Sequence, residues 1–176
     1  HFEAINHRNA IYYVEDIIKK EESFSEWQIR NIHQLILKNI DDENAGRYRQ
    51  QNVLISGATS TPPDYTLLND KMAQFIDWYN NKAHKLHPIE RAAKVHADFV
   101  GIHPFIDGNG RTSRLLMNLE LMKAGYPPCV ITVENRLAYY EALDQWMAYR
   151  KTEPFVQLIV DAVIEGFKPY QVVLGI

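Results

Sequence analysis

The chain has 176 residues, 46% of them hydrophobic and 23% charged, which indicates one folded domain with a core and excludes a largely disordered protein. With 19 basic and 22 acidic residues its formal net charge is −3, so bulk electrostatic binding of nucleic acid is excluded and any phosphate chemistry must be local. The apolar stretch 155–167 is interrupted by polar and charged residues, so no membrane-spanning segment is expected. The single cysteine, Cys129, allows no internal disulfide and fits a reducing compartment, and we expect a cytoplasmic, bacterial protein.

Two helices are predicted in the N-terminal part, residues 1–45. Apolar residues recur at helical spacing from Phe2 to Ile18 and end at a charged turn over residues 19–22. Ser25 and Gln28 form a capping-box pattern, which predicts the start of the second helix. An acidic loop with Gly46 follows it.

Residues 46–63 contain the one stretch with strand character. Val53, Leu54 and Ile55 are apolar and favour a strand, and a turn of small residues follows, closed by Pro62 and Pro63. We therefore expect a short β-hairpin that forms a flap at the edge of the fold.

Residues 64–176 predict a helical core. Apolar spacing indicates helices over about 67–79, 88–100, 115–122, 137–147 and 155–167, with Pro88 at a first helical position and Thr152 as a cap. The prediction is a mostly α-helical single domain, residues 1–176, with one small β-hairpin.

Residues 103–114 have a pattern suited to polyphosphate chemistry. The Gly-Asn-Gly run at 108–110 stands directly before a predicted helix, so its backbone N–H groups can converge on an anion at the helix N-terminus. Arg111 and Arg114 lie three residues apart in the first turns of that helix and add two cations on neighbouring faces. This combination suits a polyphosphate better than a single phosphate.

A metal ligand and a base are predicted at the start of the same segment. Asp107 offers a hard oxygen ligand where a phosphate-bound Mg²⁺ would lie. His103 precedes Pro104, which favours an extended backbone and would let the imidazole face the loop. A neutral imidazole there could accept a proton from an incoming hydroxyl, a contribution of about 10²–10⁴ in rate. The sequence thus predicts nucleotide-dependent transfer to a hydroxyl.

Other site types fit this pattern less well. No Lys follows the glycines, which excludes a Walker loop, and Ser113 stands where a dinucleotide fingerprint needs a third glycine. His84, His87 and His96 lack the spacing and the cysteines of a zinc site. We expect His96 in the core and the other two histidines in surface turns.

Segment 103–114 resembles the signature of the Fic family, H-x-F-x-[DE]-G-N-G-R-x-x-R, at every specified position. Three further stretches resemble features of Fic proteins: residues 46–49, the turn ending at 62–63, and Arg136 with the tyrosine pair 139–140. The resemblance implies a Fic-like helical bundle with a β-hairpin flap. It also implies a protein adenylyltransferase that transfers AMP from ATP to a Ser, Thr or Tyr hydroxyl of a target protein, or of itself, and releases pyrophosphate. Removal of AMP is a further activity that it implies.

The resemblance implies a role for each matching residue. His103 would be the general base, Asp107 would bind Mg²⁺, and Phe105 would pin the loop into the core. The implied nucleotide-binding residues are Gly108, Asn109, Gly110, Arg111, Thr112, Ser113, Arg114, Tyr139 and Tyr140. The implied flap residues that dock the target backbone are Ile55, Ser56, Gly57, Ala58 and Thr59. Tyr140 and Trp146 suit the hydrophobic core equally well, so two interpretations of Tyr140 stay open.

Regulation is also expected from the resemblance. Many Fic proteins are restrained by a helix with the motif [ST]-x-x-x-E-[GN], whose Glu pairs with the second arginine of the signature, here Arg114. Glu3 lacks the following Gly or Asn and is interpreted as an ordinary first-turn acid. Because the chain begins with His1, we expect a fragment that lacks an upstream inhibitory helix.

Alternatives to AMP transfer stay open. Gly110 stands where phosphate-transferring toxin relatives carry Lys, which disfavours their nucleotide geometry. Another nucleotidyl or phosphoryl transfer is compatible with a loop that does not select the base. A non-catalytic module that senses nucleotide and binds a peptide is the other alternative, although such a module needs no base at His103.

Overall fold

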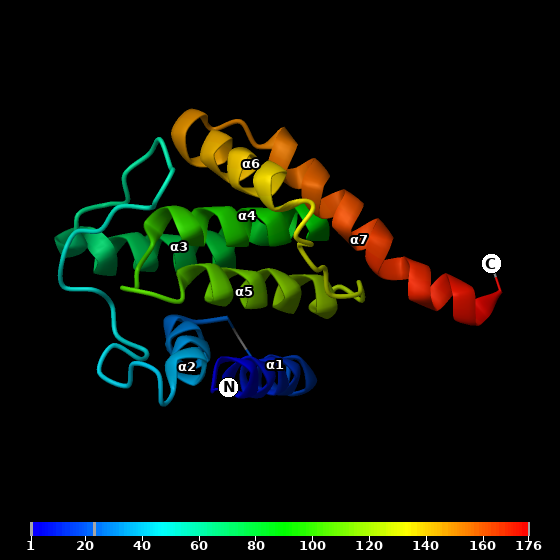
Figure 1. The fold of residues 1–176 in the computed structure, drawn as a ribbon, viewed down its shortest axis with the longest axis horizontal. Helices are drawn as coiled ribbons and strands as arrows, with labels where there is room; N and C mark the ends of the chain where they lie inside the picture. The colour runs from blue at the N-terminus through cyan, green and yellow to red at the C-terminus, as the bar shows by residue number, and fades with distance from the viewer. Residues whose placement is uncertain (1, 23, 176) are drawn as a thin grey trace.

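The computed structural model describes residues 2–22 and 24–175, which form α-helices, two short 3-10 helices and loops (Figure 1). The α-helices are α1 (Phe2–Lys19), α2 (Glu26–Leu37), α3 (Leu68–Lys82), α4 (Pro88–Ile102), α5 (Asn109–Lys123), α6 (Arg136–Tyr149) and α7 (Glu153–Leu174). The 3-10 helices η1 (Tyr65–Leu67) and η2 (Ala83–Lys85) flank α3. The predicted mostly helical class is confirmed. His1, Ser23 and Ile176 lie outside the described residues, and with them the outer limits of the predicted domain.

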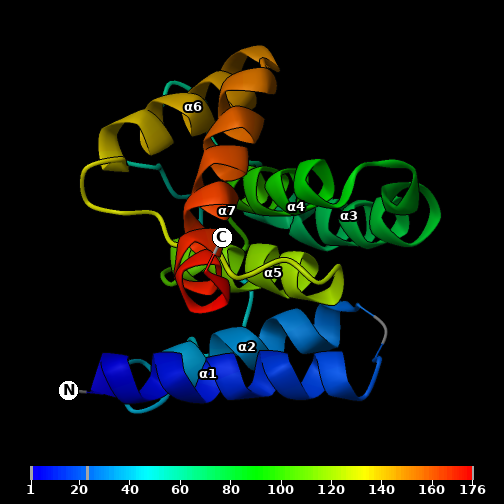
Figure 2. The ribbon, with the colours of Figure 1, turned by 90° about the vertical axis from the view of Figure 1, so that its right-hand side faces the viewer.

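Helices α4 and α5 form the centre of the bundle. α1 and α2 run antiparallel as a pair below α5, while α3 lies beside α4 and the α6–α7 pair covers the other side (Figure 2). α4 contacts α3, α5, α6 and α7, whereas α5 contacts α1, α2 and α4. The C-terminal half of α7 extends away from the body of the molecule (Figure 1). The loop between α4 and α5 is therefore held by the two most enclosed helices.

The core is divided into two clusters on the two faces of α5. Leu116 packs in one cluster with Phe99 and Phe105, between α5 and the α1–α3 side. Its neighbour Met117 packs in the other cluster with Trp146 and Phe155, on the α6–α7 side. Because consecutive residues of α5 are buried on opposite sides, both the position and the rotation of this helix are fixed. The predictions that Phe105, His96 and Trp146 are buried are confirmed.

Local sequence signals position several helix ends as predicted. The Ser25 N–H donates to Gln28 Oε1 at 3.2 Å and the Gln28 N–H donates to Ser25 Oγ at 3.4 Å, completing the capping box of α2. Pro88 is the first residue of α4. α7 continues to Leu174, past its predicted end near residue 167, with Pro169 inside it. Along the described residues no helix is both long and apolar enough to cross a membrane.

The predicted β-hairpin is wrong. Residues 50–63 form an extended loop, the flap loop, and no strand occurs in residues 2–22 and 24–175. A hairpin needs reciprocal backbone hydrogen bonds between two strands, but the Thr59 N–H donates to the Asp144 side chain at 2.7 Å. Pro62 and Pro63 have no N–H to donate. The short apolar run at 53–55 therefore has no partner strand, and its composition alone does not make one.

Candidate active site

His103 ends α4 at the mouth of the predicted phosphate loop. Its backbone is left-handed, φ 51° and ψ 57°, and its N–H donates to the Phe99 carbonyl at 3.0 Å. The predicted extended backbone is thus wrong, because the helix-ending conformation prevails over the bias imposed by Pro104. A left-handed non-glycine residue costs about 1–2 kcal/mol, which the surrounding packing must offset.

The hydrogen bonding of His103 fixes its tautomer. Nδ1 lies 3.2 Å from the Val100 carbonyl, which can only accept, so Nδ1 carries the proton and Nε2 keeps its lone pair. Burial lowers the pKa of His103, with the Val100 hydrogen bond opposing this effect and Arg49 adding to it. The ring is therefore neutral at pH 7, with a basic nitrogen available to a ligand.

The residues predicted to bind an anion lie at the N-terminus of α5. Gly108 caps the helix with φ 78°, a conformation that glycine adopts without strain. The first hydrogen bond of the helical ladder runs from the Thr112 N–H to the Gly108 carbonyl at 2.9 Å. The N–H groups of Asn109, Gly110 and Arg111 precede that ladder and stand at the positive end of the helix dipole.

Asp107 and Arg111 occupy the mouth of this loop. The Asp107 side chain is 67% exposed, and its Oδ2 lies 3.0 Å from an Arg111 nitrogen. Mg²⁺ is commonly bound by one or two carboxylates together with substrate phosphates, and a lone accessible carboxylate beside an anion nest fits that mode. Among the described residues no cluster of three or more His, Cys, Asp or Glu could hold a metal unaided. A metal here would thus depend on the phosphates of a bound nucleotide.

The two tyrosines of the predicted nucleotide wall differ in accessibility. Tyr139 is 3% exposed, and its hydroxyl lies 2.9 Å from His96 Nε2. Burial raises the pKa of Tyr139, and the neighbouring guanidinium of Arg114 opposes the rise. Tyr140 is 52% exposed, so the interpretation of this residue as part of the core is wrong. Of the two, only the Tyr140 ring is accessible to a ligand, whereas the buried Tyr139 interacts with the Arg114 guanidinium.

Thr112 and Ser113 have buried side chains. Both are fully enclosed beneath the start of α5, and the Ser113 hydroxyl donates to the Gly110 carbonyl at 3.0 Å. Neither residue exposes surface to a ligand in this structure, so their predicted contact with a nucleotide is not seen. Arg114, by contrast, lies over the nest, since a Cβ built on Gly110 would lie 3.4 Å from one of its guanidinium nitrogens.

The predicted docking residues lie in the flap loop. Ser56, Gly57 and Thr59 are exposed, while Ile55 and Ala58 are half-buried. Thr59 is tied to α6, because its N–H and its hydroxyl each donate to the Asp144 carboxylate at 2.7 Å. The loop is held at this tip without being part of a sheet.

The profile of the Fic/DOC family matches residues 23–121, more than half of the chain. The chain belongs to the Fic/DOC family. "Protein adenylyltransferase Fic" of Nematostella vectensis is 42% identical over 161 residues, which cover 90% of this chain and 37% of the relative. The chain thus spans little more than a third of the length of that curated relative.

Solved structures of Fic proteins have the same fold. Fic-1 (residues 134–508) of C. elegans superposes with a TM-score of 0.89 at 33% identity, covering 99% of this chain and 52% of that one. BepC of Bartonella tribocorum, with bound AMPPNP, superposes with a TM-score of 0.65 at 18% identity, covering 90% of this chain and 86% of that one. At that identity the likeness concerns the fold alone.

The loop between α4 and α5, residues 103–108, is called the Fic loop. His33 on α2 supports this loop and was missed by the sequence reasoning. Its Nδ1 accepts the Gly46 N–H at 2.9 Å, so the proton is on Nε2, which donates to the Asp107 carbonyl at 2.8 Å. The ring also stacks on Phe105, with centroids 3.6 Å apart and planes 4° from parallel. A Cβ at Gly108 would lie 3.1 Å from His33 Nε2, so glycine is needed there for contact as well as conformation.

Asn109 closes the Fic loop on itself. Its side-chain oxygen accepts the Phe105 N–H at 3.0 Å, and its side-chain nitrogen donates to the Phe105 carbonyl at 2.8 Å. Both polar atoms of the side chain are therefore hydrogen-bonded within the loop, and only the backbone of Asn109 can contribute to the predicted anion site.

Arg49 joins the base of the flap loop to His103. It lies in the stretch 46–49 that resembles Fic proteins, but no role was predicted for it from the sequence. Its guanidinium is the donor to three carbonyl groups: that of His103 at 2.9 Å, of Gln51 at 2.8 Å and of Pro63 at 2.6 Å. Arg49 is buried, and its own N–H donates to the Pro104 carbonyl at 2.9 Å. Both ends of the flap loop are thus fastened to the residue predicted as the base. The arrangement is invisible in sequence, because all the acceptors are backbone atoms.

The first turn of α1 reaches the same site. Glu3 is 75% exposed, and its Oε1 lies 3.3 Å from an Arg111 nitrogen. It is a first-turn acid, as predicted, and it also contacts the Fic motif. Arg111 is therefore placed between two carboxylates, those of Glu3 and Asp107, and bound phosphate would have to compete with them.

Proposed function

We propose that this chain is the catalytic part of a protein adenylyltransferase, which transfers AMP from ATP to a Ser, Thr or Tyr hydroxyl of a target protein. One observation carries the proposal: the basic Nε2 of neutral His103 stands on the same short loop as the open N-terminus of α5. The curated relatives named protein adenylyltransferase support this choice of reaction. AMPPNP, an ATP analogue, is bound in the BepC structure.

In this mechanism the loop binds the phosphates and His103 accepts one proton. The target hydroxyl oxygen attacks the α-phosphorus, its proton passes to His103 Nε2, and the bond from the α-phosphorus to the bridging oxygen breaks so that pyrophosphate leaves. The N–H groups at the start of α5, with Arg111 and Arg114, would stabilise the charge on the phosphates.

Asp107 would hold Mg²⁺ against the bound phosphates. The ion would neutralise charge on the α- and β-phosphates and on the departing pyrophosphate. Binding requires Asp107 to exchange its contact with Arg111, which would free the guanidinium for the nucleotide. Because the Asp107 carboxylate is exposed, its contact with the half-buried Arg111 contributes little free energy, and the exchange costs little.

The target would dock along the flap loop and place its hydroxyl near His103. Exposed Ser56 and Gly57 leave backbone groups accessible to an extended segment, and Arg49 keeps the loop at a fixed distance from the base. An inhibitory helix that pairs a Glu with Arg114 would restrain the reaction in a longer form of the protein.

Transfer of label from differently labelled ATP tests the proposal. The chain is incubated with a cell lysate and with ATP labelled at the α- or the γ-phosphate, in parallel with α-labelled GTP and UTP. Protein labelled from α-labelled but not γ-labelled ATP is expected. Label from the γ-phosphate would indicate phosphoryl transfer, and ATP binding without any label would indicate a nucleotide sensor; either result would refute the proposal.

A further inference from the structure

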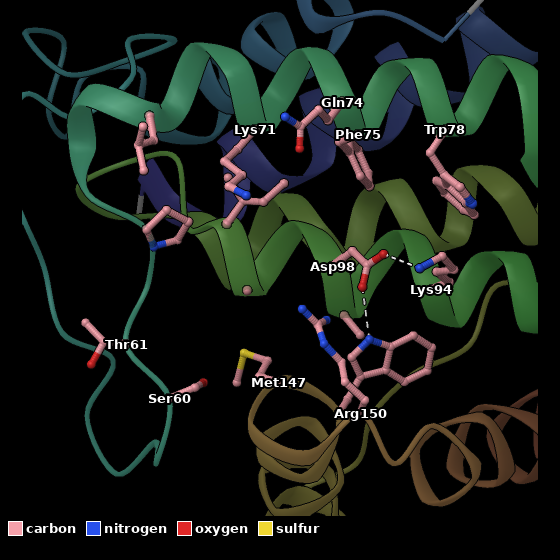
Figure 3. A pocket seen from close by; sticks show the side chains of 16 residues that line it. Ser60, Thr61, Lys71, Gln74, Phe75, Trp78, Lys94, Asp98, Met147 and Arg150 are labelled. Atoms are coloured by element: carbon pink, nitrogen blue, oxygen red, sulfur yellow. Dashed lines mark hydrogen bonds and ion pairs between the residues drawn. The ribbon is translucent and has the colours of Figure 1, made fainter.

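A groove separate from the Fic loop runs along α4. It has a volume of about 630 Å³ and lies between α3, α4, the C-terminal end of α6 and the second half of the flap loop (Figure 3). Lys71, Gln74, Phe75 and Trp78 line it from one face of α3. Neither Asp107 nor the arginines of the motif contribute to its walls.

One end of the groove is rigid and aromatic. The Lys94 ammonium lies 4.8 Å from the ring centroid of Trp78 and 6.0 Å from that of Trp146, and it forms an ion pair with Asp98 at 2.5 Å. The other Asp98 oxygen accepts the Trp146 indole N–H at 2.9 Å. Both Asp98 oxygens are therefore engaged: one is paired with Lys94, which lies against the Trp78 ring, and the other holds the Trp146 indole.

The remaining charge of the groove is positive and available. Lys71 on α3 and Arg150 at the end of α6 point into it from opposite walls (Figure 3). In residues 2–22 and 24–175 neither side chain forms an ion pair, and both residues are exposed. The chain as a whole carries a formal charge of −3, so the positive charge of this groove is opposite in sign to the net charge of the chain.

The groove ends next to the site of proposed chemistry, without including its residues. Its wall includes Gly101 and Ile102, directly before His103, and also Ser60, Thr61 and Pro63 of the flap loop. From Ile102 back to Lys94 along α4 is about 12 Å at 1.5 Å per residue. An extended chain would cover that length with about four residues. A segment that leaves the flap loop can thus reach the aromatic end in one short run.

We propose that this groove binds an acidic, extended segment of the protein substrate, next to the segment held by the flap loop. Its carboxylates would face Lys71 and Arg150, and an apolar side chain would pack beside the half-buried Trp78 ring. The proposal rests on the proposed function for its choice of partner. It adds a substrate preference: targets with acidic residues within about four positions of the part of the chain that lies against the flap loop.

The test uses two fluorescent peptides and binding by anisotropy. Both carry one Thr and a Trp, and they differ only in that one has a run of Asp where the other has Asn. Wild-type protein is compared with Lys71→Glu, with Arg150→Glu, and with Lys82→Glu as a matched control, since Lys82 is an exposed lysine of α3 outside the groove. ATP affinity and transfer of α-label to the Asn peptide are measured on the same samples.

Wild type and Lys82→Glu are expected to prefer the Asp peptide by about tenfold, and the groove variants to lose that preference with unchanged ATP affinity. Equal binding of both peptides by wild type would overturn the proposal, as would an equal loss in Lys82→Glu. Weaker ATP binding by Lys71→Glu would also overturn the proposal, because it would show that the groove binds the nucleotide. If the peptide preference is found but no protein transfers label, the proposed function fails while the docking site stands.

Discussion

Replacing His33 by Phe is the perturbation that most sharply tests how the Fic loop is held. Phe retains a planar ring that can stack on Phe105, but it removes the acceptor of the Gly46 N–H and the donor to the Asp107 carbonyl. A buried polar group left without its partner costs about 1–3 kcal/mol. Since one of these two bonds is only partly buried, we expect His33→Phe to lower the free energy of unfolding by about 2–4 kcal/mol.

The same substitution should also weaken nucleotide binding, because the Asp107 carbonyl sets the direction of the loop that enters α5. Urea unfolding followed by circular dichroism measures the stability, and titration calorimetry with ATP measures the affinity. His84→Phe is the matched control, since His84 is an exposed histidine on η2 and should change neither quantity. A stability loss no larger than that of the control, with unchanged ATP affinity, would refute the account of the loop.

Three further outcomes are expected. Arg49→Lys should make the flap loop the first site of cleavage in limited proteolysis with little change in helix content, because the single ammonium nitrogen of lysine cannot reach three carbonyls that are bonded by three different guanidinium nitrogens; unaltered cleavage would contradict this. Glu3→Gln should raise ATP affinity by no more than about fivefold, because its contact with Arg111 is exposed, and a decrease would show that Glu3 helps to bind nucleotide. Burial lowers the pKa of His33 to about 4, that of His96 to about 3, and also that of His103. The free energy of unfolding should therefore fall as the pH drops from 6.5 toward 4, because the unfolded chain then binds more protons than the folded one. A urea midpoint that stays constant over this pH range would exclude this.

The features that were predictable from sequence depend on neighbouring residues. The capping box at Ser25 and Gln28, the proline at the start of α4 and the Gly-Asn-Gly run at the start of α5 act within one helical turn, so their spacing alone indicates their geometry. The candidate site could be proposed for the same reason, because the residues predicted as its base, metal ligand and anion nest lie in one short segment.

The features that were not predictable depend on contacts between distant segments. His33 lies far from Asp107 in sequence, and a histidine on an apolar helix face has the same pattern whether it supports a loop or fills a core. Arg49 donates hydrogen bonds to backbone carbonyls, and because every residue has a backbone carbonyl, the residue types of the acceptors do not reveal this contact. The hairpin prediction was wrong because strand propensity at 53–55 does not supply a partner, and Thr59 bonds α6 instead.

The central claim is that His103 accepts the proton during AMP transfer from a loop that is already formed. Its most direct test measures α-label transfer from ATP by wild type, His103→Ala and His84→Ala, with ATP affinity determined for each. The account predicts that His103→Ala transfers label at least about 10²-fold more slowly than wild type and keeps its ATP affinity within a few-fold. His84→Ala should transfer label at the wild-type rate. Label transfer by His103→Ala at the wild-type rate would contradict the account.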